Sequence, residues 1–205
     1  MGHRFAEIAF TRAVQAQQEA RGSRANYARF AEGEVRNDRL GTKEIDFIHS
    51  RDSFYLASVS ETGWPYVQFR GGSPGFVRVL DERTLAWADF RGNRQYVSVG
   101  NLTGDDRVAL ILMDYVNRRR LKLLGHAELR EVGEDEGLAA QVAVPGYRAV
   151  VERAVRVRVA GFDWNCPQHI PSRFTLDEIE DAVTPLRERV AKLEAKLASC
   201  EEKFV

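Results

Sequence analysis

Two polar side chains alternate with an aromatic one in a short segment that is expected to form a strand. Gln68 and Arg70 flank Phe69, and Gly71 and Gly72 follow. Because side chains of a strand point alternately to its two faces, Gln68 and Arg70 share one face. Hydrogen-bonding groups on that face indicate a ligand surface, but they are also common on the solvated face of an antiparallel sheet. Both interpretations remain open at this point.

A second cluster leaves a strand, turns at a glycine and enters a helix. It reads Asp89-Phe90-Arg91-Gly92-Asn93-Arg94-Gln95. The free N–H groups and the positive dipole end of a helix N-terminus favour a phosphate. Arg94 can add a charge-assisted hydrogen bond, and Asn93 can cap the helix. An ordinary asparagine-capped helix with surface arginines would have the same sequence, so the motif alone does not establish a phosphate site.

Basic residues also gather on two late strand segments. They are Arg118, Arg119, Arg120 and Lys122 at one predicted hairpin, and Arg153, Arg156 and Arg158 near the last strand. Such a local positive field fits an anionic ligand or an acidic surface of another subunit. Ordinary solubilising charge would produce the same pattern.

The sequence gives little support to other kinds of chemistry. Cys166 and His169 form a C-x-x-H pair, but no second pair is spaced to complete a tetrahedral zinc site. There is no Gly-x-Ser-x-Gly turn, phosphate loop or dinucleotide-binding fingerprint. Hydrolase and nucleoside triphosphatase functions are therefore disfavoured, and no metal site is predicted.

Composition narrows the class of protein further. The chain has 205 residues, with 30 Lys+Arg against 30 Asp+Glu and only two cysteines. A zero net charge argues against a nucleic-acid-binding protein, and two cysteines exclude a disulfide scaffold. The longest apolar run, at 108–113, is too short to span a bilayer. We expect a cytoplasmic, reduced protein that interacts with neither nucleic acid nor membrane.

The elements that must position these clusters are mainly strands. Strand-like segments separated by turn residues occur at 53–60, 65–71, 76–80, 84–90, 107–115, 119–132 and 150–162. Their spacing predicts a β-barrel or sandwich. Helices are expected from Phe5 to a stop at Arg21-Gly22-Ser23, and over 42–49, 93–102 and 134–144, with 24–41 as a surface connection.

The C-terminal segment differs in kind. Thr175-Leu-Asp-Glu178 is a capping box that predicts a helix start. Apolar residues then follow in alternating steps of four and three, at Ile179, Val183, Leu186, Val190, Leu193 and Leu197. This spacing is typical of a coiled-coil seam. Pro185 is predicted to kink this helix or to begin a second one. The expected organisation is 1–41 (helix and connection), 42–174 (barrel) and 175–205 (helical extension).

Taken together and in this order, the clusters identify a family resemblance. Over about residues 44–174 the chain resembles the pyridoxamine 5′-phosphate oxidase-like superfamily, in particular its flavin-nucleotide-binding branch. The resemblance rests on the 89–95 run, on the helix ending in Gly100-Asn101-Leu102, and on the loop Trp164-Asn-Cys-Pro-Gln-His169. It implies a mainly β fold with flanking helices, in which a six-stranded antiparallel split β-barrel forms a homodimer with two FMN molecules at the subunit interface.

The resemblance also implies roles for particular residues. After the turn Gly63-Trp64-Pro65, Gln68 matches an arginine that binds the FMN phosphate, and Arg70 lies two residues further on. Asn93-Arg94-Gln95 matches a Ser-Arg-Lys phosphate-binding run, and Asp89 replaces a threonine near the flavin. Arg120 matches a residue of the second subunit at the flavin ring, while Trp164 and Arg173 match a tryptophan and an arginine near the chain end. The implied cofactor-binding residues are Gln68, Phe69, Arg70, Gly71, Asp89, Asn93, Arg94, Gln95, Arg120, Trp164 and Arg173.

The leading hypothesis is an FMN-binding homodimer that acts as a flavin-dependent oxidoreductase on an unknown substrate. The chain continues into a charged helix where the oxidases carry a substrate-binding segment, so pyridoxine or pyridoxamine phosphate is not the expected substrate. No side chain offers a convincing general acid or base, and no catalytic residue is predicted. Alternative cofactors are FAD, a deazaflavin or haem, with His49, His126 and His169 as candidate haem ligands. Alternative functions are a non-catalytic flavin- or haem-binding or docking module, or a structural dimer with a degenerate pocket.

Overall fold

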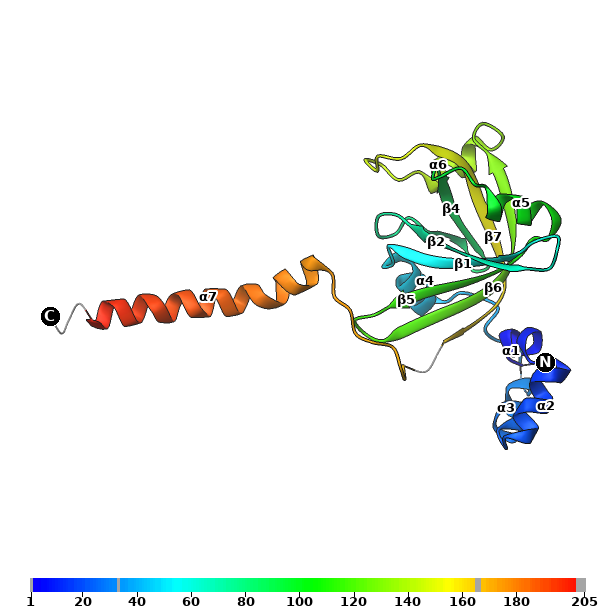
Figure 1. The fold of residues 1–205 in the computed structure, drawn as a ribbon, viewed down its shortest axis with the longest axis horizontal. Coiled ribbons are helices and arrows are strands. Elements are labelled where there is room, and N and C mark those ends of the chain that lie inside the picture. Colours follow the sequence, from blue (N-terminus) through cyan, green and yellow to red (C-terminus); the bar gives the residue numbers. More distant parts are fainter. Residues whose placement is uncertain (1, 33, 165–166, 202–205) are drawn as a thin grey trace. The chain divides into compact units, whose positions relative to one another are not determined.

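Seven strands form one antiparallel sheet in the computed structural model, which describes residues 2–32, 34–164 and 167–201 (Figure 1). The strands are β1 (Ser53–Val59), β2 (Pro65–Gly71), β3 (Arg78–Asp81), β4 (Thr84–Phe90), β5 (Arg107–Asp114), β6 (Arg119–Glu131) and β7 (Val151–Trp164). They are ordered β2-β1-β5-β6-β7-β4-β3. The six-stranded barrel implied by the resemblance is therefore wrong for this chain. The short strand β3 pairs only with β4 and adds a seventh strand to the sheet. Strands β2 and β3 are the two edges of this sheet.

The sheet curls around an apolar core. Alternate residues of the long strands point inward, as Leu110 and Leu112 do on β5 and Leu121 and Leu123 on β6, and all four are buried. Arg70 on β2 forms an ion pair with Asp89 on β4, although the two strands are far apart in the strand order. A side-chain contact between such strands requires the sheet to bend back toward itself.

Two helices cover the sheet, and each does so through its apolar residues. Helix α4 (Thr42–His49) contributes Phe47 and Ile48 to the main core. At its N-terminus, the backbone N–H of the N-cap residue Gly41 donates to Glu44 Oε2 at 3.1 Å. Helix α6 (Glu136–Val142) packs its buried residues on a second cluster formed by small residues of β4 and β7. That cluster comprises Leu138, Val142, Ala86, Ala88 and Ala154.

The N-terminal segment contains more structure than the sequence pattern predicts. The expected single helix is divided into α1 (Arg4–Ala9) and α2 (Arg12–Ala20), because Thr11 caps α2 by accepting a hydrogen bond from the Val14 N–H at 3.4 Å. The expected connection contains α3 (Arg24–Ala28) and the 3₁₀ helix η1 (Arg29–Ala31). Aromatic packing stabilises these short elements: the Tyr27 ring meets both Phe10 and Phe30 edge-on, at 5.4 and 5.6 Å.

A glycine is required where the ladder between β6 and β7 shifts register, at Gly125. A Cβ atom there would lie 2.7 Å from the Arg158 carbonyl oxygen and 2.7 Å from Val157 Cγ1. We expect Gly125→Ala to lower the free energy of unfolding by about 1–3 kcal/mol, as overpacking in a closed site does. Urea denaturation measures the change. Gly100→Ala is the control, because a Cβ there meets nothing within 4 Å; an equal midpoint for the two variants would contradict the prediction.

A second compact unit comprises residues 115–118 and 168–205 of the chain. Within its described part, helix α7 (Leu176–Glu201) runs continuously through Pro185 (Figure 1). The predicted capping box is confirmed: the Thr175 N–H donates to Glu178 Oε2 at 2.8 Å, and the Glu178 N–H donates to Thr175 Oγ1 at 3.2 Å. Pro185 therefore begins no second helix. None of the described helices has the length and apolar composition required to cross a membrane.

Candidate functional site

The main candidate site is a cavity of about 250 Å³ in the compact unit that holds the sheet. It lies between β2, the end of β4, the loop that follows β4 and the first turn of α5 (Val97–Gly104). Residues that are distant in sequence meet there. Six of the predicted cofactor-binding residues line the cavity: Gln68, Arg70, Asp89, Asn93, Arg94 and Gln95.

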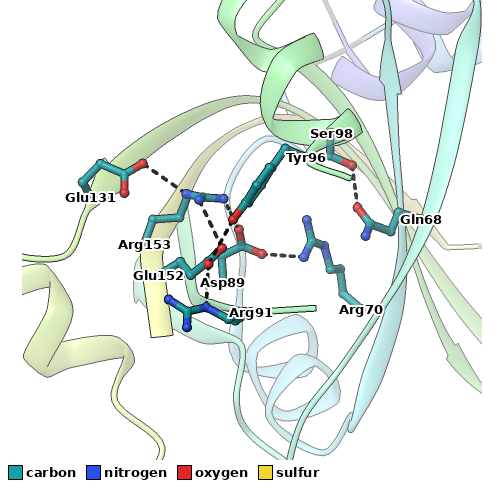
Figure 2. A network of polar contacts seen from close by, with 9 residues as sticks. All are labelled: Gln68, Arg70, Asp89, Arg91, Tyr96, Ser98, Glu131, Glu152 and Arg153. Atoms are coloured by element: carbon teal, nitrogen blue, oxygen red, sulfur yellow. Dashed lines mark hydrogen bonds and ion pairs between the residues drawn. The ribbon is translucent and has the colours of Figure 1, made fainter. Parts of the chain in front are cut away.

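Asp89 is the centre of the charge network in this cavity (Figure 2). Period-two alternation on β4 places Asp89 on the same face as the buried Leu85 and Trp87, at the end of the strand. One carboxylate oxygen accepts a hydrogen bond from Arg70 Nη1, and the other accepts one from Arg153 Nη1 at 2.9 Å. Asp89 therefore holds two guanidinium groups from opposite sides of the cavity.

Arg153 is the most enclosed cation of the network, with a side chain that is 8% exposed. It faces Asp89 directly across the β4–β7 ladder. Its Nε lies 3.2 Å from Glu131 Oε1, and its Nη2 lies 3.3 Å from Glu152 Oε2. Burial opposes the charge, but Asp89 and Glu131 outweigh it and raise the pKa of Arg153 above its ordinary value. Arg153 is thus a fixed positive charge in the cavity wall.

The loop between β4 and α5 is held by Glu152 (Figure 2). The carboxylate accepts from Arg91 Nε at 2.8 Å and from the Tyr96 hydroxyl at 3.1 Å. The hydrogen bond from Arg91 lowers the pKa of Glu152 below its ordinary value. Glu152 therefore remains ionised and positions the aromatic ring of Tyr96 at the cavity edge.

The loop has an unusual backbone, which changes the expected helix start. Arg94 and Tyr96 have φ values of 63° and 54°, a left-handed conformation that is rare for residues other than glycine. The Asn93 side chain accepts from the Gln95 N–H at 3.2 Å, so it stabilises this turn and does not cap a helix. The predicted helix over 93–102 is corrected to α5, whose first turn has no side-chain cap. Backbone strain of this kind is concentrated at functional sites.

Gln68 connects the edge strand to the helix. Its Oε1 accepts a hydrogen bond from Ser98 Oγ at 2.7 Å. One turn later, Asn101 Nδ2 donates to Ser58 Oγ on β1 at 3.0 Å, in a buried position. These two contacts hold successive turns of α5 against β2 and β1. Sequence reasoning missed Ser98, Tyr96 and Glu152, since none of them belongs to a motif that marks it.

Two predicted residues lie on the opposite face of the sheet. Phe69 is 59% exposed and its ring meets Tyr55 at 5.6 Å. Arg120 lies on the same face, opposite Met113, and its buried Nε has no hydrogen-bond partner among the described residues. The strand register places exposed apolar residues of β2, β1 and β5 beside each other on this face. This outer face, as we call it, comprises Tyr55, Val67, Phe69 and Ile111. Gly71 ends β2 opposite Ser53.

The remaining predicted residues have other surroundings. Trp164 Nε1 donates to Glu44 Oε1 at 2.7 Å, and its ring meets Phe47 edge-on at 4.8 Å. It therefore anchors α4 and does not line the cavity. Arg173 belongs to the unit that contains α7, where its guanidinium lies 4.8 Å from the centre of the Tyr115 ring.

The metal and haem candidates do not converge on the cavity. Cys166 lies outside the described residues, as does part of the loop that contributes to the resemblance. Within the described ranges, no group of three or more His, Cys, Asp or Glu side chains is placed to hold a metal ion. His49 is the last residue of α4. His126 lies on β6, and its Nδ1 is 2.9 Å from Asp106 Oδ1. Neither of them lines the cavity.

Comparison with known proteins identifies the class. A family model described as pyridoxamine 5′-phosphate oxidase matches residues 42–159, so the chain belongs to the pyridoxamine 5′-phosphate oxidase family. None of the curated proteins matches this chain.

The solved structures that resemble this chain share little sequence with it. HupZ from Group A Streptococcus is 17% identical to this chain, and the match covers 66% of this chain and 100% of HupZ, with a TM-score of 0.47. A pyridoxamine 5′-phosphate oxidase candidate from Lactobacillus delbrueckii is 20% identical over 62% of this chain and 94% of its own (TM-score 0.47). General stress protein 26 from Bacillus anthracis is 14% identical over 60% and 91%, with a TM-score of 0.40.

Proposed function

We propose that this protein binds FMN in the cavity beside Asp89, as a homodimer, and acts as a flavin-dependent oxidoreductase. The observation that carries the proposal is the convergence of six residues from β2, β4 and the following loop on one cavity, in a chain of this family. When bound, FMN would supply the electron-transfer chemistry. The chain's own residues would bind it, orient it and exclude water.

The charges around the cavity fit a phosphate. Three guanidinium groups, of Arg70, Arg94 and Arg153, face the carboxylates of Asp89 and Glu152, which leaves one net positive charge. Arg70 Nε is buried and has no hydrogen-bond partner among the described residues. The uncapped first turn of α5 adds free N–H groups, which favour an anion.

The cavity is small for a whole FMN molecule, which supports a cofactor site that two copies of the chain complete together. A cavity of about 250 Å³ is below the roughly 300–1,000 Å³ typical of ligand pockets, so it suits the phosphate end of FMN better than the whole cofactor. The outer face presents a contiguous set of exposed apolar residues, which is typical of a protein–protein interface. We infer that two copies pair through this face, which would bring Phe69 and Arg120 to the subunit interface.

Titration of the purified full chain with FMN, followed by flavin fluorescence, tests the proposal. Arg94→Ala removes a cavity cation that forms no ion pair with the described residues. A hydrogen bond with Tyr96 is the main cause that raises the pKa of Arg94 above its ordinary value. A hydrogen bond to a charged group contributes about 1.5–3 kcal/mol, so we expect FMN affinity to fall about 10- to 100-fold.

Two controls make this result specific. Riboflavin lacks the phosphate, so its affinity should be the same for the wild type and Arg94→Ala. Arg107→Ala removes an exposed cation that is paired with Asp105 and does not line the cavity, so it should leave FMN affinity within about twofold. Failure of the wild-type chain to bind FMN would overturn the proposal. Mass spectrometry of the ligand released on denaturation distinguishes FMN from FAD or a deazaflavin.

A further inference from the structure

The described part of α7 presents an apolar stripe along its length, and most members of this stripe are exposed. Because the helix passes through Pro185 without a break, the stripe extends over its whole length. Its members are Leu176, Ile179, Val183, Leu186, Val190, Leu193 and Leu197. Leu176 is 85% exposed, and Leu186 and Leu197 are each 64% exposed. A solvent-exposed stripe of this length is typical of a helix that binds a partner helix.

We propose that α7 forms a parallel two-stranded coiled coil with α7 of a second copy of this chain. The inference is independent of the flavin site, because no residue of α7 lines the cavity. It commits to a partner of the same sequence and to one orientation. Both choices follow from the residues at particular heptad positions.

The core positions favour two parallel helices. Steps of three and four residues assign Leu176, Val183, Val190 and Leu197 to position a, and Ile179, Leu186 and Leu193 to position d. β-Branched residues at a with leucine at d favour parallel dimers, and both central layers, Val183 with Leu186 and Val190 with Leu193, follow this rule. Pro185 falls at position c, on the side away from the seam. It can therefore remain in the helix without disturbing the interface.

The flanking charges favour a second copy in parallel orientation. In a parallel dimer, a residue at g faces a residue at e of the other helix, five positions later in sequence. Arg189 at g would then face Glu194 at e of the second copy, and symmetry makes this attractive pair twice. In an antiparallel dimer the g positions face one another, and Arg189 and Lys196 are both cations. The remaining e-position arginine, Arg187, is already paired within its own helix, with Glu180 at 2.5 Å.

Cysteine cross-linking in the full chain tests this inference. In a Cys166→Ser/Cys200→Ser background, Leu193→Cys places a thiol at a d position, where parallel helices bring identical residues together. We expect mild oxidation to convert most of this variant to a covalent dimer of about 46 kDa, twice the 23.2 kDa of one chain. Glu188→Cys at position f is the matched control, on the outward side of the same helix, and should remain a single chain.

The outcomes separate this proposal from the others. Absence of the covalent dimer, or equal cross-linking of both variants, would overturn it and would point to a different partner for the stripe. Adding Arg189→Glu to Leu193→Cys should reduce cross-linking severalfold, and adding Glu194→Arg as well should restore it. Cross-linking should persist without FMN and in Arg94→Ala, so failure of the flavin proposal would leave this result unchanged.

Discussion

Asp89→Ala is expected to lower the free energy of unfolding by about 3 kcal/mol or more, among the largest effects of any single substitution in the cavity. The carboxylate is shared by Arg70 and Arg153, and all three side chains are at least four-fifths buried. Its removal leaves two enclosed cations without their common counter-charge, and the penalty of an unpaired buried charge exceeds the value of the pair itself. Urea denaturation of both proteins measures the difference.

The control for this prediction is an exposed ion pair. Glu82→Ala removes the partner of Arg39 in an ion pair whose two side chains are both more than half exposed, and should cost less than about 1 kcal/mol. Inorganic phosphate should raise the thermal midpoint of Asp89→Ala more than that of the wild type, because the anion can replace the missing carboxylate between the arginines. Equal stabilisation of the two proteins would mean that these arginines are not available to an anion in the cavity.

Phe69→Asp should have the second large effect, on assembly and on FMN binding together. Burying a carboxylate in the apolar outer face would cost at least about 3 kcal/mol, which corresponds to roughly 100-fold weaker pairing. The test is made in a Leu186→Glu/Leu193→Glu chain, so that α7 does not hold two copies together. Sedimentation should then show monomers. FMN affinity should fall in parallel if, as proposed, the second copy completes the site around the edge strand β2, which carries both Phe69 and the cavity residues Gln68 and Arg70.

An equally exposed apolar residue elsewhere provides the comparison. Val132 is 57% exposed in the turn after β6, away from the outer face, and Val132→Asp should leave both the dimer and FMN binding intact. A Phe69→Asp chain that remains dimeric and binds FMN normally would contradict the proposed interface. A monomeric chain that still binds FMN would place the complete cofactor site within one copy.

The sequence predicted individual elements better than it predicted their assembly. The bounds expected for β2 and β4 agree with the structure, and strand patterns were recognisable at all seven strands. The count of six came from the family resemblance, whereas the sequence pattern itself indicated seven strand-like segments. The prediction of a single N-terminal helix was wrong, because the apolar periodicity alone does not reveal the N-cap at Thr11 that separates α1 from α2.

For the candidate site, too, the sequence predicted the residue types better than their arrangement. Its residue types were recognisable because Gln68, Arg70 and the 89–95 run interrupt apolar strands with groups that bind anions. The helix start was wrong because the left-handed backbone at Arg94 and Tyr96 delays it, and the Tyr96 hydroxyl donates to Glu152, which lies 56 residues away in sequence. Trp164 was predicted to bind the cofactor; in the structure its ring meets Phe47 of α4, and it is not among the residues that line the cavity.

By itself, the sequence determined the strands, the capped C-terminal helix and the chemical character of the loop that follows β4. These properties depend on side-chain alternation, turn residues and caps, which act within a few positions of the chain. Only the tertiary structure decided that Asp89 holds Arg70 and Arg153 together, and that Phe69 and Arg120 share the outer face. Those placements depend on strand register and on the curl of the sheet, which result from packing of the whole core rather than from any local segment.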